Sequence, residues 1–320
     1  MNLKHKQNLV GIMTVLFFFL SGNVSSATLE MTPYGEINIS RNWIDSNGSS
    51  DSYWISNVSK LGFKGSYAID DSLSVIYQLE QEVDYVHGGT DADTLFGMRN
   101  SFIGLEGDFG KVFWGIHDTP LKKAQGKVDV FNDQAGDIKT LLVGEIRSTD
   151  SFMYNSPVFA ENYSVQTMYA PADSNFDAGY SAALSYQNGD LSAALAMDSG
   201  MRKNNKSVLS TKVYDSARLA VQYAIGSWKL GAIIQQSERQ NAVGADKETG
   251  YVMSAIYKFN DWAFLMQTGR SDIIAEGGKA DSLGVDYFFN KKTKTYLYWS
   301  NLGDDLGDYD IVSLGFEFKF

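Results

Sequence analysis

Hydrophobic and polar residues alternate with a period of two along much of the chain. In residues 29–40 the odd positions are apolar or small, and the even positions are polar, charged or tyrosine. The same alternation recurs in residues 216–223 and 310–320. These segments approach the ~10 residues with which a tilted strand crosses a membrane, whereas strands of a soluble β-sandwich usually have about five or six. Because successive side chains of a strand point to opposite faces, the pattern predicts a transmembrane β-barrel with an apolar outer face.

The connections between these segments alternate between short turns and longer polar loops. The short turns are Asp70-Asp71, Asn188-Gly189-Asp190, Gly226-Ser227, Asn260-Asp261 and Asn290-Lys291. The longer polar segments are 45–52, 84–93, 117–138, 171–177, 199–211, 238–248, 271–281 and 301–308. This alternation predicts an all-β fold, an antiparallel barrel of about 16 strands with both ends on the periplasmic side. Counts of about 14 or about 18 stay open, because one strand split or fused in this interpretation shifts the total.

The N-terminus has the three parts of a secretory signal peptide. Basic residues, an apolar run and small residues follow one another at Lys4 and Lys6, at 9–20 and at 25–27. We therefore expect residues 1–27 to be a cleaved signal peptide. A membrane anchor is the alternative, but the apolar run is shorter than the ~20 residues of a spanning helix. After Thr28 no stretch approaches ~18 consecutive apolar residues, so residues 28–320 are expected to form one barrel domain without a transmembrane helix.

Composition narrows the classes of function. The chain has no cysteine, so disulfides cannot stabilise it, and a closed sheet can. Its formal net charge of -11 argues against nucleic acid as a partner, because neutralising phosphates requires a basic surface.

Short motifs recur in a fixed order through the chain. They are Tyr34-Gly35, Lys60 to Gly65, Tyr77 to Glu80, Arg99 to Leu105, Phe109-Gly110, Asp118 to Pro120, and Tyr154 to Pro157 with Phe159. Together with the terminal Phe320, they resemble the Gram-negative general (non-specific) outer-membrane porin family, especially its neisserial and proteobacterial branch. Each motif alone is weak, but their order covers essentially all of residues 28–320.

The resemblance implies a function and a set of partners. Members of this family let small hydrophilic solutes and ions diffuse passively across the Gram-negative outer membrane, and they lie in its lipids as homotrimers. The terminal aromatic pattern of Phe316, Phe318 and Phe320 resembles the signal that the barrel-assembly machinery reads. The resemblance implies no cofactor.

The family resemblance also implies an in-folded third loop, here 117–138, that constricts the pore. Asp129, Asp133 and Asp137 lie four residues apart and would form one acidic edge if the loop were locally helical. A polar surface loop is the alternative interpretation of these acids.

In the family, such acids face basic residues on the barrel wall. Lys60 and Arg99 match that wall and lie on the inward register of their strands. Arg147, which follows the loop, and Arg218, which points inward, are two further candidates. The alternative is that these arginines only pair with nearby acids.

Two departures from the family pattern make the wall less basic. Glu36 follows Tyr34-Gly35 where many relatives carry a basic residue, and Ile116 follows Gly115 where the family often has arginine. Because charged residues around a narrow opening sort ions by sign, we expect a mild cation preference.

An enzymatic role is disfavoured. Only His87 and His117 remain after signal cleavage, and no zinc, nucleophile-elbow or phosphate-loop motif occurs. The alternatives are a substrate-specific porin for oligosaccharides or another nutrient, and a plugged structural barrel. Binding of one solute would distinguish the first, and an absence of conductance the second.

Overall fold

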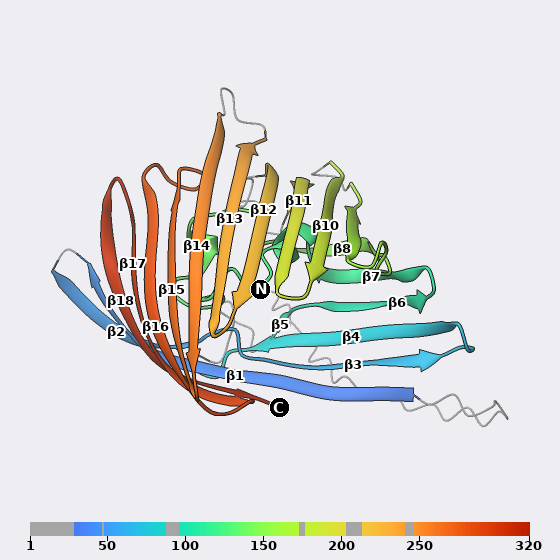
Figure 1. The fold of residues 1–320 in the computed structure, drawn as a ribbon, viewed down its shortest axis with the longest axis horizontal. Helices are drawn as coiled ribbons and strands as arrows, with labels where there is room; N and C mark the ends of the chain where they lie inside the picture. The colour runs from blue at the N-terminus through green and yellow to red at the C-terminus, as the bar shows by residue number, and fades with distance from the viewer. Residues whose placement is uncertain (1–28, 47, 88–95, 173–176, 203–212, 241–245) are drawn as a thin grey trace, which may run out of the picture.

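A single closed sheet forms the protein (Figure 1). The computed structural model describes residues 29–46, 48–87, 96–172, 177–202, 213–240 and 246–320, so the expected signal peptide lies outside the described residues. The sheet has 18 hydrogen-bonded segments, and it closes because β1 (Leu29–Ser46) pairs with β18 (Gly307–Lys319). All its pairings are antiparallel, as predicted.

Two barrel strands are each interrupted once. Both β2 (Ser49–Ser56) and β3 (Lys60–Ala68) pair with β1, and both β5 (Phe96–Met98) and β6 (Ser101–Gly107) pair with β4 (Leu73–Val83). The 18 segments therefore make 16 barrel strands, which confirms the predicted number.

The remaining strands follow one another around the barrel in chain order. They are β7 (Gly110–Asp118), β8 (Arg147–Asn155), β9 (Tyr163–Ala170), β10 (Gly179–Asn188), β11 (Leu191–Met201), β12 (Tyr214–Ile225), β13 (Trp228–Arg239), β14 (Lys247–Phe259), β15 (Trp262–Ser271), β16 (Gly278–Asn290) and β17 (Thr293–Asp304). Four of the predicted short turns join consecutive strands between β10 and β17, and Asp70-Asp71 joins β3 to β4. Gly226 and Asn260 have φ of 58° and 52°, which glycine and asparagine adopt at low cost.

Two of the predicted long loops are tight hairpins instead. β1 continues to Ser46 and β2 begins at Ser49, while β17 continues to Asp304 and β18 begins at Gly307. Their polar side chains pair across the strands, as when Ser50 donates to Asp45 at 2.6 Å. Polarity alone did not distinguish a loop from a strand that carries polar residues.

The predicted alternation of faces is confirmed on the strands that the sequence singled out. On β12, Leu219 on the outer face is 43% exposed, whereas Arg218 and Ser216 on the inner face are buried. On β18, Phe316 and Phe318 face outward and Ser313 faces inward. An apolar outer face suits a lipid environment. The polar side chains of the inner face are buried as well, so another part of the chain lies against them inside the barrel.

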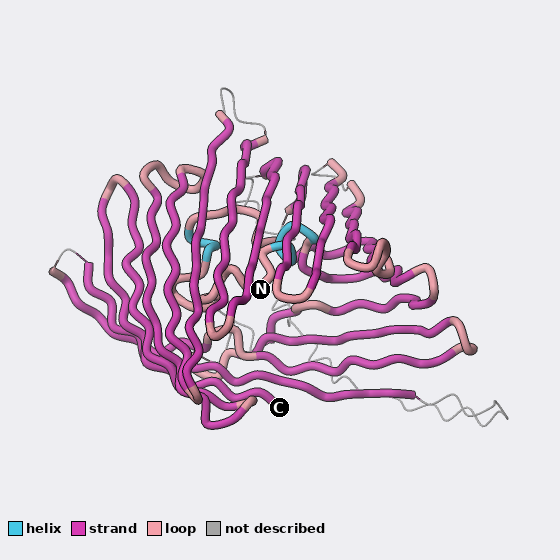
Figure 2. The backbone as a smooth tube through the Cα atoms, viewed as in Figure 1, coloured by secondary structure: helices cyan, strands magenta, loops and turns pink. Residues whose placement is uncertain are grey.

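The segment between β7 and β8 provides that cover. It spans residues 119–146, which is longer than the predicted 117–138, and contains α1 (Pro120–Ala124) and the 3-10 helix η1 (Ile138–Thr140). Figure 2 shows both helices inside the wall of strands. Within the described residues, neither helix nor any other has the length and apolarity to cross a membrane.

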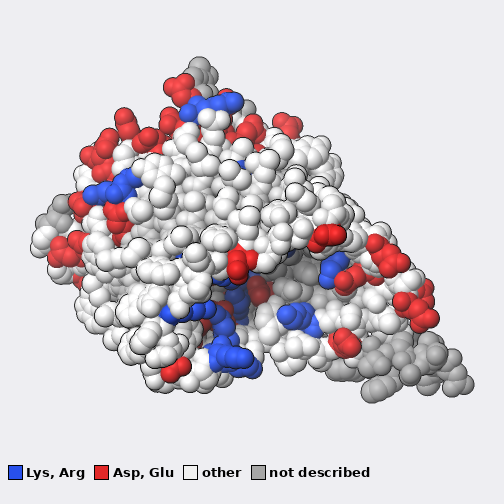
Figure 3. All heavy atoms as spheres, viewed as in Figure 1, with Lys and Arg blue, Asp and Glu red and all other residues white. Residues whose placement is uncertain are grey.

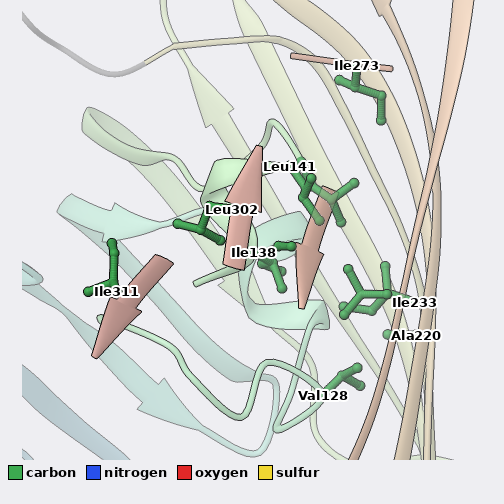
Figure 4. Close-up of a cluster of buried hydrophobic side chains, with 11 residues drawn as sticks. Val128, Ile138, Leu141, Ala220, Ile233, Ile273, Leu302 and Ile311 are labelled. Atoms are coloured by element: carbon green, nitrogen blue, oxygen red, sulfur yellow. The ribbon is translucent and has the colours of Figure 1, made fainter. Parts of the chain in front are cut away.

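Apolar side chains dock this third loop on the wall. A buried cluster joins Val128, Ile138, Leu141 and Leu142 of the loop to side chains of several strands (Figure 4). The partners on the wall are Ala220, Ile233, Val252, Ala280, Leu302 and Ile311, with Ile273 beyond β15. Burial of apolar area against these strands stabilises the loop inside the barrel.

Candidate functional site

The third loop begins with the capped helix α1, which lies against the inner face of the barrel wall. The Thr119 side chain accepts a hydrogen bond from the backbone N–H of Lys122 at 3.1 Å, and Pro120 occupies the first turn of α1. Both features favour helix initiation. The N–H of Leu121 then donates to Ser181 Oγ on β10 at 3.2 Å, which ties the start of the loop to the barrel.

Arg218 of β12 joins both ends of the third loop. It lies on the inner face, where the alternation put it, but the loop covers its side chain completely. Its guanidinium donates to the carbonyls of Leu121 at 3.3 Å and Val143 at 3.2 Å, and to Glu145 at 3.0 Å. Its Nε donates to Gln235 Oε1 at 2.7 Å. Arg218 therefore holds the loop and does not face an open lumen.

Two glutamines of the wall also hold the third loop. Gln235 Nε2 donates to the carbonyl of Val143 at 2.9 Å. Gln267 accepts from the N–H of Val130 at 2.9 Å and donates to the carbonyl of Gly136 at 2.8 Å. These side chains replace the strand partners that the loop backbone lacks, because buried backbone groups need hydrogen bonds.

The predicted acidic residues have different environments. Residues 127–137 form turns and no helix, and Asp133 has φ of 63°, so the condition for one acidic edge is not met. Buried Asp129 accepts from the N–H groups of Phe131 and Ile138, at 3.2 and 3.3 Å. Burial, with the nearby Asp137, raises the pKa of the Asp129 carboxyl well above its ordinary value.

Asp137 is buried as well and shapes the turn. Its carboxylate accepts from the N–H of Lys139 at 2.8 Å and of Asp133 at 2.9 Å, and it lies 3.2 Å from the Lys139 ammonium. Asp133 itself is half-buried. Two of the three acids thus cap backbone groups, which limits their contact with passing ions.

The other basic residues expected on the wall are each paired with a carboxylate. Lys60 of β3 lies 3.2 Å from Glu36. Arg99, between β5 and β6, contacts Glu80 at 3.0 Å and Glu82 at 2.9 Å. Arg147 of β8 contacts Asp118 at 3.0 Å.

Of these partner acids, only Glu36 was expected from sequence to affect the charge of the wall, while Glu80 and Asp118 were noted only as parts of motifs. Glu80 and Glu82 lie two residues apart on β4, and Glu82 is directly opposite Lys60. The period-two pattern of β4 could therefore have identified them as inward-facing.

Charged side chains of both signs gather in the hollow of the barrel (Figure 3). Near the ends of the strands, Lys294 contacts Asp286 at 3.0 Å and Lys319 contacts Glu317 at 2.6 Å. The carboxylates of Asp286 and Glu317 are therefore each neutralised by a lysine within ion-pair distance.

Exposed charge on the third loop is mainly basic. Lys123, Lys127 and Lys139 are exposed, whereas the four acids of the loop are buried or half-buried. The exposure of these lysines was not predicted from sequence. The apolar residues Leu121, Ala124 and Val128 lie on the buried side of the segment and could have indicated that the lysines lie on the opposite, exposed side.

The two histidines among the described residues differ in exposure. His87 is exposed, 3.3 Å from Asp84. His117 packs against the rings of Phe102 and Phe113, with centroids 5.6 and 5.3 Å away. In the part of the chain that the structure describes, no group of three or more His, Cys, Asp or Glu side chains is arranged to hold a metal ion.

Comparison with known proteins identifies similar sequences. The model of a family described as Gram-negative porin matches residues 13–304. Major outer membrane protein P.IB of Neisseria gonorrhoeae is 32% identical over 286 residues, which cover 80% of this chain and 80% of that protein. Major outer membrane protein P.IA of Neisseria meningitidis serogroup C is 26% identical, over 81% of this chain and 82% of that protein.

Solved structures share the fold at lower sequence identity. An anion-selective porin from Comamonas acidovorans superposes with a TM-score of 0.72 at 20% identity, and covers 92% of this chain and 100% of its own. OmpF of Salmonella typhi, in a complex with daunomycin, superposes with a TM-score of 0.73 at 16% identity, over 91% of this chain and 97% of its own.

Proposed function

This chain belongs to the Gram-negative porin family, and we propose that it is a general diffusion porin. Its place is the Gram-negative outer membrane, as the names of its relatives and its barrel fold indicate. Small hydrophilic solutes and ions cross passively through a water-filled lumen. The observation that carries this proposal is the third loop, which packs across the inner face of a closed 16-strand barrel and narrows it.

The anchoring of the loop supports a constriction of constant width. Arg218, Gln235 and Gln267 bind the loop on one side of the barrel, from β12 to β15. The paired charges Lys60, Arg99 and Arg147 lie at other positions around the wall, on β3, between β5 and β6, and on β8. Solutes pass between the anchored loop and the part of the wall that carries these paired charges. Catalysis and a cofactor are not needed for such transport, and we propose neither.

The balance of exposed charge favours a mild anion preference, which replaces the cation preference that we expected from sequence. That expectation rested on Glu36 and on Ile116 in place of arginine, but Glu36 lies 3.2 Å from Lys60 and 4.0 Å from Lys319. The acids of the third loop are buried or half-buried, while Lys123 and Lys127 are exposed. Charges at a narrow opening act strongly on ions, so the exposed lysines set the sign.

Processing and assembly complete the proposal. Residues 1–27 act as the cleaved signal peptide and residues 28–320 as the barrel, which assembles as a homotrimer in outer-membrane lipids. The barrel-assembly machinery recognises the terminal strand through Phe316, Phe318 and Phe320, all of which are exposed.

Swelling of liposomes that contain the purified protein tests the proposal. We expect neutral sugars to enter at rates that fall with their size, without saturation. Failure of all small sugars to enter would reject a diffusion porin and favour a plugged barrel. Entry that saturates for one oligosaccharide alone would favour the substrate-specific alternative.

A further inference from the structure

A pocket lined by charges of both signs lies between the end of the third loop and the inner wall of β11 and β12. The loop contributes Lys139 and Glu145, and the wall side contributes Asp198 of β11 and the adjoining Arg202. We call this space the Asp198 pocket. Its volume is about 210 Å³, below the roughly 300–1,000 Å³ of most ligand sites. The pocket is therefore suited to a small solute.

Asp198 has an acceptor that the protein leaves unused. The residue lies on the inner face of β11, directly opposite Ser216 of β12, and only 3% of it is exposed. Its Oδ2 accepts from the Thr119 hydroxyl at 3.4 Å. Its Oδ1 is buried and has no hydrogen-bond partner in the part of the chain that the structure describes. Buried polar atoms are normally satisfied, so this oxygen requires a donor that enters the pocket.

The charge of Asp198 also lacks a direct partner. Among the described residues, no lysine or arginine lies within ion-pair distance of its carboxylate. Arg218, which acts on Asp198 from a distance, is already paired with Glu145 at 3.0 Å. Arg202 donates to two backbone carbonyls of the segment after β9. Because a buried carboxylate without a partner is costly, the missing donor is best supplied by a cationic group.

Lys139 supplies a positive group on the loop side of the pocket. Its ammonium lies 3.2 Å from the Asp137 carboxylate, and its side chain remains 53% exposed. An ammonium has three donors, so it can bind a second carboxylate. Leu142, Ile146 and Met201 add apolar surface to the lining. The Asp198 pocket therefore combines an unused anionic acceptor, an accessible cation and apolar side chains.

We propose that the Asp198 pocket binds a small aliphatic α-amino acid during its passage through the channel, with the ammonium group at Asp198 and the carboxylate at Lys139. The inference rests on the proposed diffusion function and specifies one class of solute. The two acidic and two basic side chains of the lining balance in charge, which favours a zwitterion over a single ion. The ammonium group donates to the unsatisfied Oδ1, and such charge-assisted hydrogen bonds are stronger than neutral ones.

Binding in the pocket gives amino-acid transport a property that sugar transport lacks. A solute that gathers at the third loop crosses faster at low concentration, and its flux saturates once the pocket is full. Occupancy is transient, because a conducting pore must release what it binds. Neutral sugars have no charge for Asp198 or Lys139, so their flux should stay proportional to concentration.

Uptake of labelled L-valine by liposomes that contain the purified protein tests the site. We expect wild-type uptake to saturate as the concentration of L-valine rises. Asp198→Asn should raise the half-saturating concentration by about tenfold or more, because it removes one charge-assisted contact. Asp215→Asn is the matched control, since Asp215 is exposed on the outer face of β12, next to the pocket residue Ser216. Neutral sugars should enter all three kinds of liposome at the same rate.

Competing solutes test the two ends of the bound molecule separately. Isobutylamine lacks the carboxylate of L-valine, and 2-hydroxyisovalerate has a hydroxyl in place of the ammonium group. Each should inhibit uptake only at about tenfold higher concentration than unlabelled L-valine. Lys139→Gln should weaken inhibition by L-valine but leave inhibition by isobutylamine unchanged, which a merely structural role of Lys139 would not produce.

Three results would overturn the amino-acid site. They are linear uptake of L-valine in wild type, equal saturation in wild type and Asp198→Asn, and inhibition by isobutylamine that is as strong as that by L-valine. Failure of neutral sugars to enter wild-type liposomes would instead reject the proposed function.

Discussion

Arg218 and Glu145 form a buried ion pair, with the guanidinium NH1 3.0 Å from Glu145 Oε1. The two residues are 73 positions apart in sequence, on β12 and at the end of the third loop. Arg218 also donates to the carbonyls of Leu121 and Val143, so one side chain fixes the beginning and the end of the loop. The shape of the pore depends on this contact.

Replacing Arg218 by glutamine should loosen the third loop. Removal of one partner of a buried ion pair costs about 3–5 kcal/mol, and here the cost falls on the attachment of the loop. We expect variable single-channel conductance with frequent closures and a normal yield of folded barrel, measured in planar bilayers. Lys247→Gln removes an exposed ion pair with Glu238, between β14 and β13, and should behave as wild type. Uniform wild-type conductance in Arg218→Gln would contradict the anchoring role.

Phe131 attaches the third loop to the wall through an apolar contact, so its replacement tests the packing of the loop without changing a charge. Its ring lies edge-on to Tyr298 at 5.0 Å within a buried cluster. Phe131→Ala should destabilise the tip of the third loop by about 3–5 kcal/mol through the cavity it leaves. Limited proteolysis should then cleave within 119–146 faster than in wild type, at low and high salt alike. Phe131→Leu, which keeps most of the volume, should be cleaved at nearly the wild-type rate, and equal cleavage of all three proteins would refute the packing role.

Asp129 should make the stability of the loop depend on pH. Burial raises the pKa of its carboxyl, so folding of the loop favours the protonated form. This contribution to stability is full at acidic pH and is lost as the pH rises through the raised pKa. Closure frequency should therefore increase with pH in wild type. Asp129→Asn resembles the protonated form and should flatten that profile, whereas an unchanged profile would show that another group titrates.

Removal of Phe320 should reduce assembly without changing transport. Phe320 and Gly35 exchange two backbone hydrogen bonds, each of 3.1 Å, where the first and last strands meet. Deletion removes this pair and the terminal aromatic ring, so less folded trimer should appear on gels. The pore lies elsewhere, so conductance of the remaining channels should equal that of wild type. Normal yield with altered conductance would contradict this account.

Charge reversal on the third loop should reverse ion selectivity. Lys123→Glu with Lys127→Glu replaces exposed cations at the narrowed lumen by anions. Reversal potentials in a gradient of potassium chloride should indicate anion preference in wild type and cation preference in this variant. Lys111→Glu at another wall position should shift the potential less. Cation preference in wild type would restore the expectation from sequence.

Strand positions and faces were predictable because they depend on local patterns. Outward Leu219 and inward Arg218 follow from a period of two, and the turn at Gly226 follows from the need for positive φ. The hairpins at Ser46 and Asp304 were not predictable from polarity, since strands that reach water also carry polar residues.

The site itself depended on contacts between distant parts of the chain. The inward direction of Arg218 was predicted, but its burial beneath Leu121 and Val143 depends on where the third loop docks. The family resemblance implied that Asp129 and Asp137 were pore acids, and their spacing predicted one acidic edge only if the loop were helical. The loop instead forms turns in which these carboxylates accept from backbone N–H groups. Such turns have no periodic pattern in the sequence.

Single-channel recording of the purified wild-type protein in potassium chloride tests the central claim most directly. A water-filled lumen narrowed by an anchored loop predicts discrete current steps of uniform size that grow in proportion to salt concentration. A barrel that produces no steps, or steps that saturate at low salt, would contradict a general diffusion pore.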